Sequence, residues 1–274
     1  MTGTLYVVGT PIGNLSDLSP RAAQTLREVD FIAAEDTRVT QKLLNHFEIK
    51  KPMTSYYQHN LRERGEEILA RIESGENCAI VTDAGMPCIS DPGEDLVGLC
   101  AARGIPTVVI PGPSAAISAL AVSGLPTSRF SFEGFLSTNN KNRAAHLREI
   151  VNDRHTLIFF EAPHKLIYTL QDMLAVLGDR RVALCRELTK LHEEVIRTTF
   201  SGALAQYREK SPRGEYVLIV EGAPEPERTS LSLDEAVGQV KALRESGISV
   251  SDAAKQVAKE TGYKKGDLYR LALQ

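Results

Sequence analysis

The sequence predicts an α/β fold in which a buried, mainly parallel sheet is flanked by helices. One observation is that short apolar segments alternate with helix-like segments along the first 124 residues. A second is that these segments are continuously apolar, with Thr107 the one polar residue among them, and do not alternate with polar residues, which is typical of strands covered on both faces. The segments are Leu5–Val8, Phe31–Ala34, Cys78–Val81 and Thr107–Ile110.

Composition is that of an ordinary globular protein with about two domains, since 42% of the 274 residues are hydrophobic and 24% are charged. No apolar stretch approaches the roughly 20 residues that span a bilayer, and no signal-peptide pattern precedes Leu5. The four cysteines form no CxxC pair, so we expect reduced thiols in a cytosolic protein. Because the net charge is −3, a nucleic-acid partner would have to bind local basic patches.

Capping residues predict the helices between these strands. Ser19 is an N-cap residue followed by Pro20, which predicts a helix to about Glu28. Further helices are expected near 40–46, through Ile68, Leu69 and Ile72, near 95–103, and over Ala115–Ser123, where Gly124 ends the helix.

The segment 82–93 joins a predicted strand to a predicted helix and is unusually rich in special residues. Gly85 can adopt a positive φ, and Pro87 and Pro92 fix the backbone. Asp91 before Pro92 predicts a helix N-cap followed by proline at the first helical position. A binding loop is favoured over a simple turn, because open α/β folds bind ligands at this edge of the sheet.

A second domain is predicted over 125–222. Strand-like segments occur at 130–135, 156–160, 181–185, 194–200 and 216–220, with a helix between Pro163 and Gly178. This pattern predicts an α+β domain with antiparallel strand pairs, and the polar, basic segment 137–143 predicts a flexible loop.

Residues 223–230 have linker composition, and 231–274 predict a small helical module with helices at 233–244, 251–260 and 266–273. Four lysines between residues 255 and 270 could bind RNA in the manner of a helix-turn-helix domain, or could simply form a solvated face. They are Lys255, Lys259, Lys264 and Lys265.

Four loops follow predicted strands: 9–14, 35–38, 83–91 and 111–114. The carboxyl ends of parallel strands share one edge, so these loops could line one cleft. None is a Walker loop, a dinucleotide fingerprint or a serine elbow, and no His/Cys cluster has metal-ligand spacing. The residues alone therefore predict an α/β enzyme that binds a small molecule, with the reaction undefined.

The motifs taken together resemble the ribosomal RNA small-subunit methyltransferase I family over nearly the whole chain. They are GTPIGNLSD at 9–17, AEDTR at 34–38, TDAGMPCISDPG at 82–93, PGPSA at 111–115, SGLP at 123–126, FEGFL at 132–136, FEAPHK at 160–165 and RELTK at 186–190. Two departures from the family pattern conserve charge. Met86-Pro87-Cys88 replaces a frequent Thr-Pro-Leu, and Lys165 replaces arginine.

This resemblance implies a class III, tetrapyrrole methylase-like methyltransferase with a cleft between two α/β domains, S-adenosylmethionine as methyl donor, and a homodimer. It also implies methylation of a cytidine ribose 2′-hydroxyl in the decoding region of small-subunit (16S) rRNA. The donor contacts implied are Pro11, Ala84, Gly85, Met86, Ile89, Ser114, Ala115, Glu161 and Gly202.

A weakly acidic hydroxyl benefits from a general base, for which Asp36, Asp83 and Glu35 are candidates. Each carboxylate could instead have a structural role, such as an ion pair with Arg38. Arg38, Arg186 and Lys190 are candidate RNA contacts, although the last two could pair with Glu187.

Tyr56, Tyr57 and His59 could stack on bases or serve as core or dimer contacts. Two alternative functions are a tetrapyrrole methyltransferase and a non-catalytic ribosome-binding assembly factor.

Overall fold

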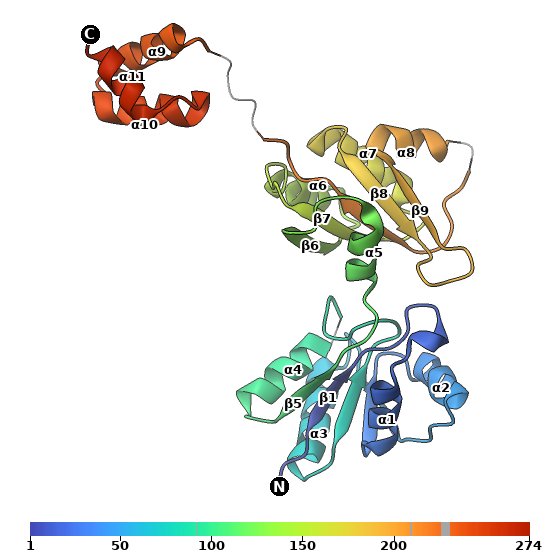
Figure 1. The fold of residues 1–274 in the computed structure, drawn as a ribbon. Helices are drawn as coiled ribbons and strands as arrows, with labels where there is room; N and C mark the ends of the chain where they lie inside the picture. Colours follow the sequence, from blue (N-terminus) through green and yellow to red (C-terminus); the bar gives the residue numbers. More distant parts are fainter. Residues whose placement is uncertain (92, 209, 226–230) are drawn as a thin grey trace. The chain divides into compact units, whose positions relative to one another are not determined.

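Two five-stranded sheets lie in residues 1–223, and three further helices follow them in the chain (Figure 1). The computed structural model describes residues 1–91, 93–208, 210–225 and 231–274. These residues divide into two compact units, Met1–Ala223 and Pro224–Gln274. The sequence-based boundary between 124 and 125 falls inside the first unit and stays a prediction.

The first sheet is parallel throughout, in the order β3-β2-β4-β1-β5. Its strands are β1 (Leu5–Val8), β2 (Phe31–Ala34), β3 (Met53–Ser55), β4 (Cys78–Val81) and β5 (Thr107–Ile110). Four of them match the apolar segments of the sequence. Strand β3 was not predicted, because it has only three half-buried residues and no apolar run.

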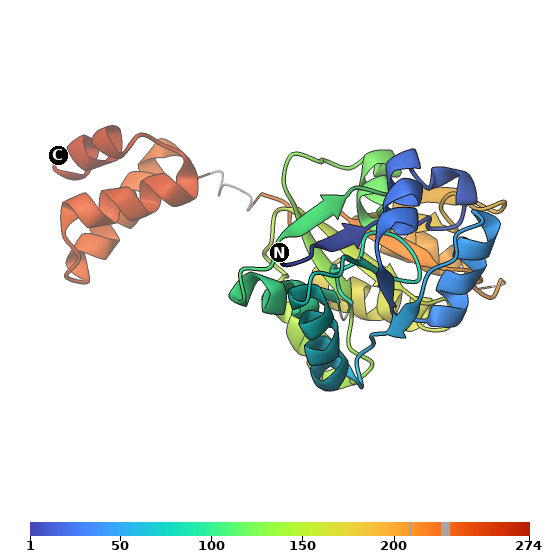
Figure 2. The ribbon, with the colours of Figure 1, turned by 90° about the horizontal axis from the view of Figure 1, so that it is seen from below.

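Helices cover both faces of this sheet (Figure 2). Helices α1 (Pro20–Glu28) and α2 (Thr37–His46) pack on one face, and α3 (Leu61–Glu73) and α4 (Gly93–Ala102) pack on the other. The predicted cap is confirmed, since the Ser19 side chain accepts a hydrogen bond from the N–H of Ala22. The predicted proline start of α4 falls on Pro92, outside the described residues.

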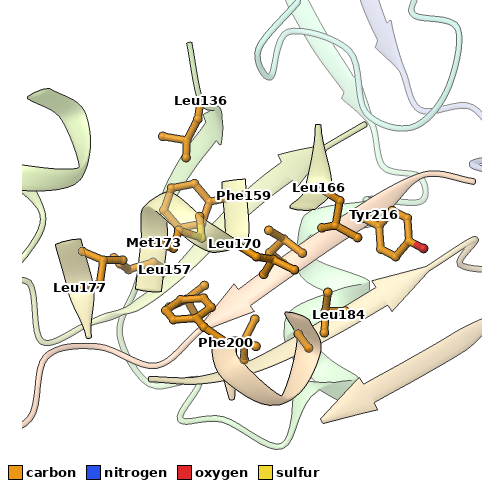
Figure 3. Close-up of a cluster of buried hydrophobic side chains, with 14 of the residues drawn as sticks. Leu136, Leu157, Phe159, Leu166, Leu170, Met173, Leu177, Leu184, Phe200 and Tyr216 are labelled. Atoms are coloured by element: carbon orange, nitrogen blue, oxygen red, sulfur yellow. The ribbon is translucent and has the colours of Figure 1, made fainter. Parts of the chain in front are cut away.

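The second sheet is mixed, in the order β6-β7-β10-β8-β9, with only β6 and β7 parallel. Its strands are β6 (Phe130–Phe135), β7 (Thr156–Glu161), β8 (Arg181–Arg186), β9 (Glu194–Thr199) and β10 (Tyr216–Val220). Helices α6 (Asn140–Glu149), α7 (Leu166–Leu177) and α8 (Phe200–Gln206) build the core on one face. Figure 3 shows Phe159, Met173 and Phe200 pointing into this core.

Helix α5 (Ala115–Ser123) follows the last strand of the first sheet but packs on the other face of the second sheet. Its residues Ala116, Ala119 and Leu120 contact a layer that includes Ile158 and Ala183. Small side chains let the helix approach this layer closely. The segment joining the two sheets is therefore part of the packing of the second one.

Two expectations for the second sheet region are wrong. Residues 137–143 were expected to be a flexible loop, but α6 begins at Asn140, and the Asn139 side chain accepts hydrogen bonds from the N–H groups of Lys141 and Asn142. This helix buries only Leu147, so it has no apolar periodicity to detect. Phe200 was expected to end a strand, but it begins α8, which Thr199 caps.

The second unit contains α9 (Leu233–Glu245), α10 (Val250–Thr261) and α11 (Lys265–Ala272), close to the predicted helices. Ser232 and Glu235 form a capping box at the start of α9. The three helices enclose a small core. Of the predicted linker, residues 226–230 lie outside the described part of the chain.

Candidate active site

A cavity of about 750 Å³ lies at the carboxyl edge of the first sheet and is bounded on its other side by residues of the second sheet. Its volume is typical of a small-molecule site. The predicted strand-end loops supply one wall, and residues from β6, β7, β8 and β10 supply the other.

Main-chain contacts tie the strand-end loops together beneath this cavity. The N–H of Thr10 donates to the carbonyl of Gly85 at 2.9 Å, and the N–H of Gly85 donates to the carbonyl of Thr10 at 3.2 Å. A Cβ on Gly9 would lie 2.7 Å from the Cα of Gly112, so the loops after β1 and β5 approach to backbone contact. The predicted convergence of strand-end loops is confirmed.

The loop after β4 has a constrained backbone. Gly85 has a φ of +90°, and a Cβ there would lie 3.3 Å from Ile12 Cγ2. Cys88 and Ser90 also have positive φ values, of 68° and 62°. The Asp91 carboxylate holds this shape, because its Oδ1 accepts from the N–H groups of Cys88 and Gly93 at 2.9 and 2.8 Å. A small ligand can therefore approach a main chain that is already in position.

Most of the predicted donor contacts line this cavity. They are Ala84, Gly85, Met86, Ile89, Ser114, Ala115 and Glu161. Pro11 is not among the lining residues, although its neighbour Ile12 is. Gly202 lies in α8 and packs on Thr198, since a Cβ there would be 2.2 Å from Thr198 Oγ1.

The second sheet contributes residues that sequence reasoning missed. Phe160 and Phe135 line the cavity with ring centroids 5.4 Å apart, and Tyr216 lines it from β10. Glu161 is buried in this wall, and its carboxylate accepts from the N–H of Ala162 at 2.8 Å and from Thr169 Oγ1 at 2.5 Å. Glu161 was predicted from the family motif at 160–165. Phe135 and Phe160 also lie in family motifs but had been given no role, and Tyr216 lies in none of them.

The three candidate bases have different environments. Glu35 and Asp83 line the cavity, whereas Asp36 does not. Hydrogen bonds from Arg38 lower the pKa of Asp36 to about 2, and the Asp36 carboxylate also caps α2. Burial and the neighbouring charge of Glu35 raise the pKa of Asp83. Thr82 Oγ1 donates a hydrogen bond of 2.6 Å to Glu35.

The basic residues predicted to contact RNA do not form one cluster around the cavity, and only Lys190 among them lines it. Lys190 lines the cavity and pairs with Glu187 at 2.9 Å and Glu215 at 3.0 Å. Arg186 forms an ion pair with Glu194, with 3.2 Å between Nε and Oε2. Arg38 is exposed and forms an ion pair with Asp36. The four candidate lysines of the second unit are exposed: Lys255, Lys259, Lys264 and Lys265.

All four cysteines are free thiols. Within the described ranges, no helix is long and apolar enough to cross a membrane. Over the same residues, no group of three or more His, Cys, Asp or Glu side chains is placed to hold a metal ion.

Comparisons with known proteins identify the class. Residues 4–203 match the family of tetrapyrrole (corrin/porphyrin) methylases. The solved uroporphyrin III C-methyltransferase of Thermus thermophilus shares the fold with a TM-score of 0.57 at 15% identity, covering 79% of this chain and 97% of its own. A diphthine synthase structure gives a TM-score of 0.61 at 16% identity, covering 80% and 90%. The fold and cavity are those of a tetrapyrrole methylase-class methyltransferase, which uses S-adenosylmethionine as methyl donor.

Sequence relatives narrow this further. The protein named ribosomal RNA small subunit methyltransferase I from Synechocystis is 46% identical, covering 99% of this chain and 98% of the relative. The protein of the same name from Thermotoga maritima is 50% identical, covering 80% and 99%. Residues 232–274 match the RsmI C-terminal HTH domain. The chain belongs to the ribosomal RNA small subunit methyltransferase I family.

Proposed function

We propose that this enzyme transfers a methyl group from S-adenosylmethionine to the 2′-hydroxyl of a cytidine ribose in the decoding region of small-subunit (16S) rRNA, in the cytoplasm. The observation that carries the proposal is that the donor loops and two carboxylates, Glu35 and Asp83, line one cavity. Family membership supplies the substrate class.

Main-chain groups around Ala84, Gly85 and Met86 are the proposed cradle of the donor, with Ile89, Ser114 and Ala115 beside them. The fit rests on Gly85, since its φ of +90° disfavours any residue with a side chain, and a Cβ there would lie 3.3 Å from Ile12 Cγ2. S-adenosylmethionine supplies an activated methyl group on a positively charged sulfur. The protein has to hold the reacting groups in line, which can lower a barrier by about 7–11 kcal/mol. Pro11 and Gly202 stay predictions from the resemblance alone.

Asp83 is the proposed general base. It lines the cavity, and its raised pKa makes it a better proton acceptor than Asp36, whose carboxylate is engaged by Arg38. Glu35 would assist by keeping the pKa of Asp83 high. Glu161, fixed by its two hydrogen bonds, is proposed as a wall residue of the donor site.

Basic residues are proposed to hold the RNA backbone. Lys190, Arg186 and Arg38 would contact phosphates near the reaction, and the four candidate lysines of the second unit would bind elsewhere on the substrate. Residues 1–124 and 125–222 are proposed as the two domains that complete the donor cleft, and 231–274 as the RNA-binding module. We propose the assembled small subunit as the substrate.

A homodimer is also proposed. Strand β5 lies at the edge of the first sheet. Two of its apolar side chains, Val108 and Val109, are exposed to solvent, and the exposed fraction of Val109 is 55%. Ile117 and Val122 on the following helix are exposed as well. Exposed apolar side chains on an edge strand are typical of a surface that a second chain covers.

Transfer of tritium from labelled S-adenosylmethionine to small subunits that lack the modification tests the function. We expect alkali-resistant label at one cytidine, and less label on naked rRNA than on assembled subunits. Label on the base would overturn the ribose assignment. Labelling of a uroporphyrinogen in place of rRNA would indicate a tetrapyrrole enzyme, and calorimetry without donor binding would indicate an assembly factor.

A further inference from the structure

A second hollow, of about 530 Å³, opens beside the donor cavity. The two share Glu35, Ser90 and Asp91, so they are adjoining compartments at the same sheet edge. One side of the second hollow is the segment between β3 and α3, and the other is the first turn of α4.

Aromatic side chains line the first side. Tyr57 and His59 lie with ring centroids 6.2 Å apart and planes at 81°, and both are exposed. Asn60 holds this segment, because its Oδ1 accepts from the N–H of Tyr57 at 2.9 Å and its Nδ2 donates to the carbonyl of Ser55 at 3.1 Å. The backbone that carries Tyr57 is therefore held in place, and the two exposed rings are available to stack on a planar ligand.

Carboxylates line the other side. Asp91 and Glu35 already accept hydrogen bonds from the protein. Glu94 and Asp95 are exposed and have no side-chain hydrogen bond or ion pair with any described residue. Over the described residues these groups are not arranged as metal ligands. They are free to accept hydrogen bonds from a ligand.

A planar ligand that fits between aromatic rings on one side and carboxylates on the other carries an amino group at its edge. A carboxylate accepts from the exocyclic N4 amine of cytosine, whereas the O4 acceptor of uracil would face the same carboxylate unfavourably. Phosphate would be repelled by this concentration of negative charge. The hollow thus suits a base of the RNA and excludes its backbone.

We propose that this second hollow is the nucleobase subsite, in which the target cytosine stacks on Tyr57 or His59 and donates its N4 amine to Glu94 or Asp95. Its ribose would then stand where the two compartments meet, beside Glu35 and within reach of the donor. The target base must leave its own stack to enter, as in other enzymes that act on single nucleotides. This inference rests on the proposed function and adds the residues that select the base.

The test compares methylation of small subunits carrying cytidine or uridine at the target position. For the unaltered enzyme we expect kcat/KM to be about 10- to 100-fold higher on cytidine. Glu94→Gln and Asp95→Asn should reduce this preference, because an amide can also donate to O4 of uracil. Tyr57→Ala and His59→Ala should lower kcat/KM on both substrates without changing the ratio. Glu149→Gln, an exposed carboxylate of α6, is the matched control and should retain the preference.

Donor binding by calorimetry accompanies each variant and should be unchanged, which shows that the variants are folded. A cytidine preference that survives in both the Glu94→Gln and the Asp95→Asn enzymes would overturn the subsite while leaving the proposed function intact. Absence of any methyl transfer by the unaltered enzyme would overturn the proposed function, and the subsite with it.

Discussion

The N–H of Asp36 donates a hydrogen bond of 3.1 Å to Oδ1 of Asp83, which joins the start of α2 to the loop after β4. The two carboxylates that the sequence offers as equivalent candidates are therefore neighbours with different surroundings. Arg38 binds the Asp36 carboxylate, whereas Asp83 lines the cavity. This difference decides which of them we propose as the base.

Asp83→Asn should lower the rate of methyl transfer by about 10²–10⁴-fold, because the amide cannot accept the proton of the hydroxyl. Single-turnover rates on small subunits measure this. Asp36→Asn is the comparison, since asparagine also caps helices, and it should reduce the rate by less than about tenfold. Equal losses in the two variants would contradict the assignment of the base to Asp83.

The rate should depend on pH through Asp83. Burial and then the charge of Glu35 raise the pKa of this carboxyl, so activity should increase as pH rises through that raised pKa and the base becomes ionised. Glu35→Gln removes the neighbouring negative charge, so the acid side of the profile should move to lower pH. A profile that does not move would mean that another group titrates.

Gly9→Ala should weaken donor binding and lower the melting temperature. Its Cβ would lie 2.7 Å from the Cα of Gly112, so the loops after β1 and β5 would have to separate, at a cost of about 1–3 kcal/mol. The matched control is Gly98→Ala within α4, where a Cβ meets nothing within 4 Å. That change should stabilise the protein by up to about 1 kcal/mol. Thermal unfolding and calorimetry would measure both effects, and unaltered donor affinity in Gly9→Ala would argue against a cradle built on this contact.

Replacing Lys255, Lys259, Lys264 and Lys265 by glutamine should weaken binding of rRNA and reduce the slope of log K against log salt by up to about 3, if all four contact phosphates. Donor affinity should not change. Lys241→Gln on α9 serves as a single-charge control and should leave the slope nearly unaltered. An unchanged slope in the fourfold variant would assign these lysines to a solvated face.

Val109→Asp should convert a dimer into monomers, because a charge would be buried where the exposed edge strand meets a second chain. Light scattering coupled to size-exclusion chromatography measures the mass. Tyr168→Asp, at an exposed position of α7, is the control and should keep the dimer mass. A monomeric unaltered protein would remove the proposed dimer.

Local patterns in the sequence determined much of this molecule. Apolar runs predicted four strands of the first sheet. Capping residues predicted helix ends, since Ser19 begins α1 and Gly124 ends α5 as expected. The family motifs predicted most of the residues by which the loops after β4 and β5 line the cavity. In the loop after β1 they indicated Pro11, whereas the lining residue there is Ile12. These features depend on residues close together in the chain, which is why they can be read without a structure.

Only the tertiary structure decided the rest. The packing of α5 on the second sheet and the aromatic wall around Phe160 depend on contacts between distant segments. The same holds for the separate environments of Asp36 and Asp83, and for the second hollow between the β3–α3 segment and α4. Residue type and spacing do not encode burial or the distance between side chains on different loops. Those quantities follow only when the strands are paired and the helices packed.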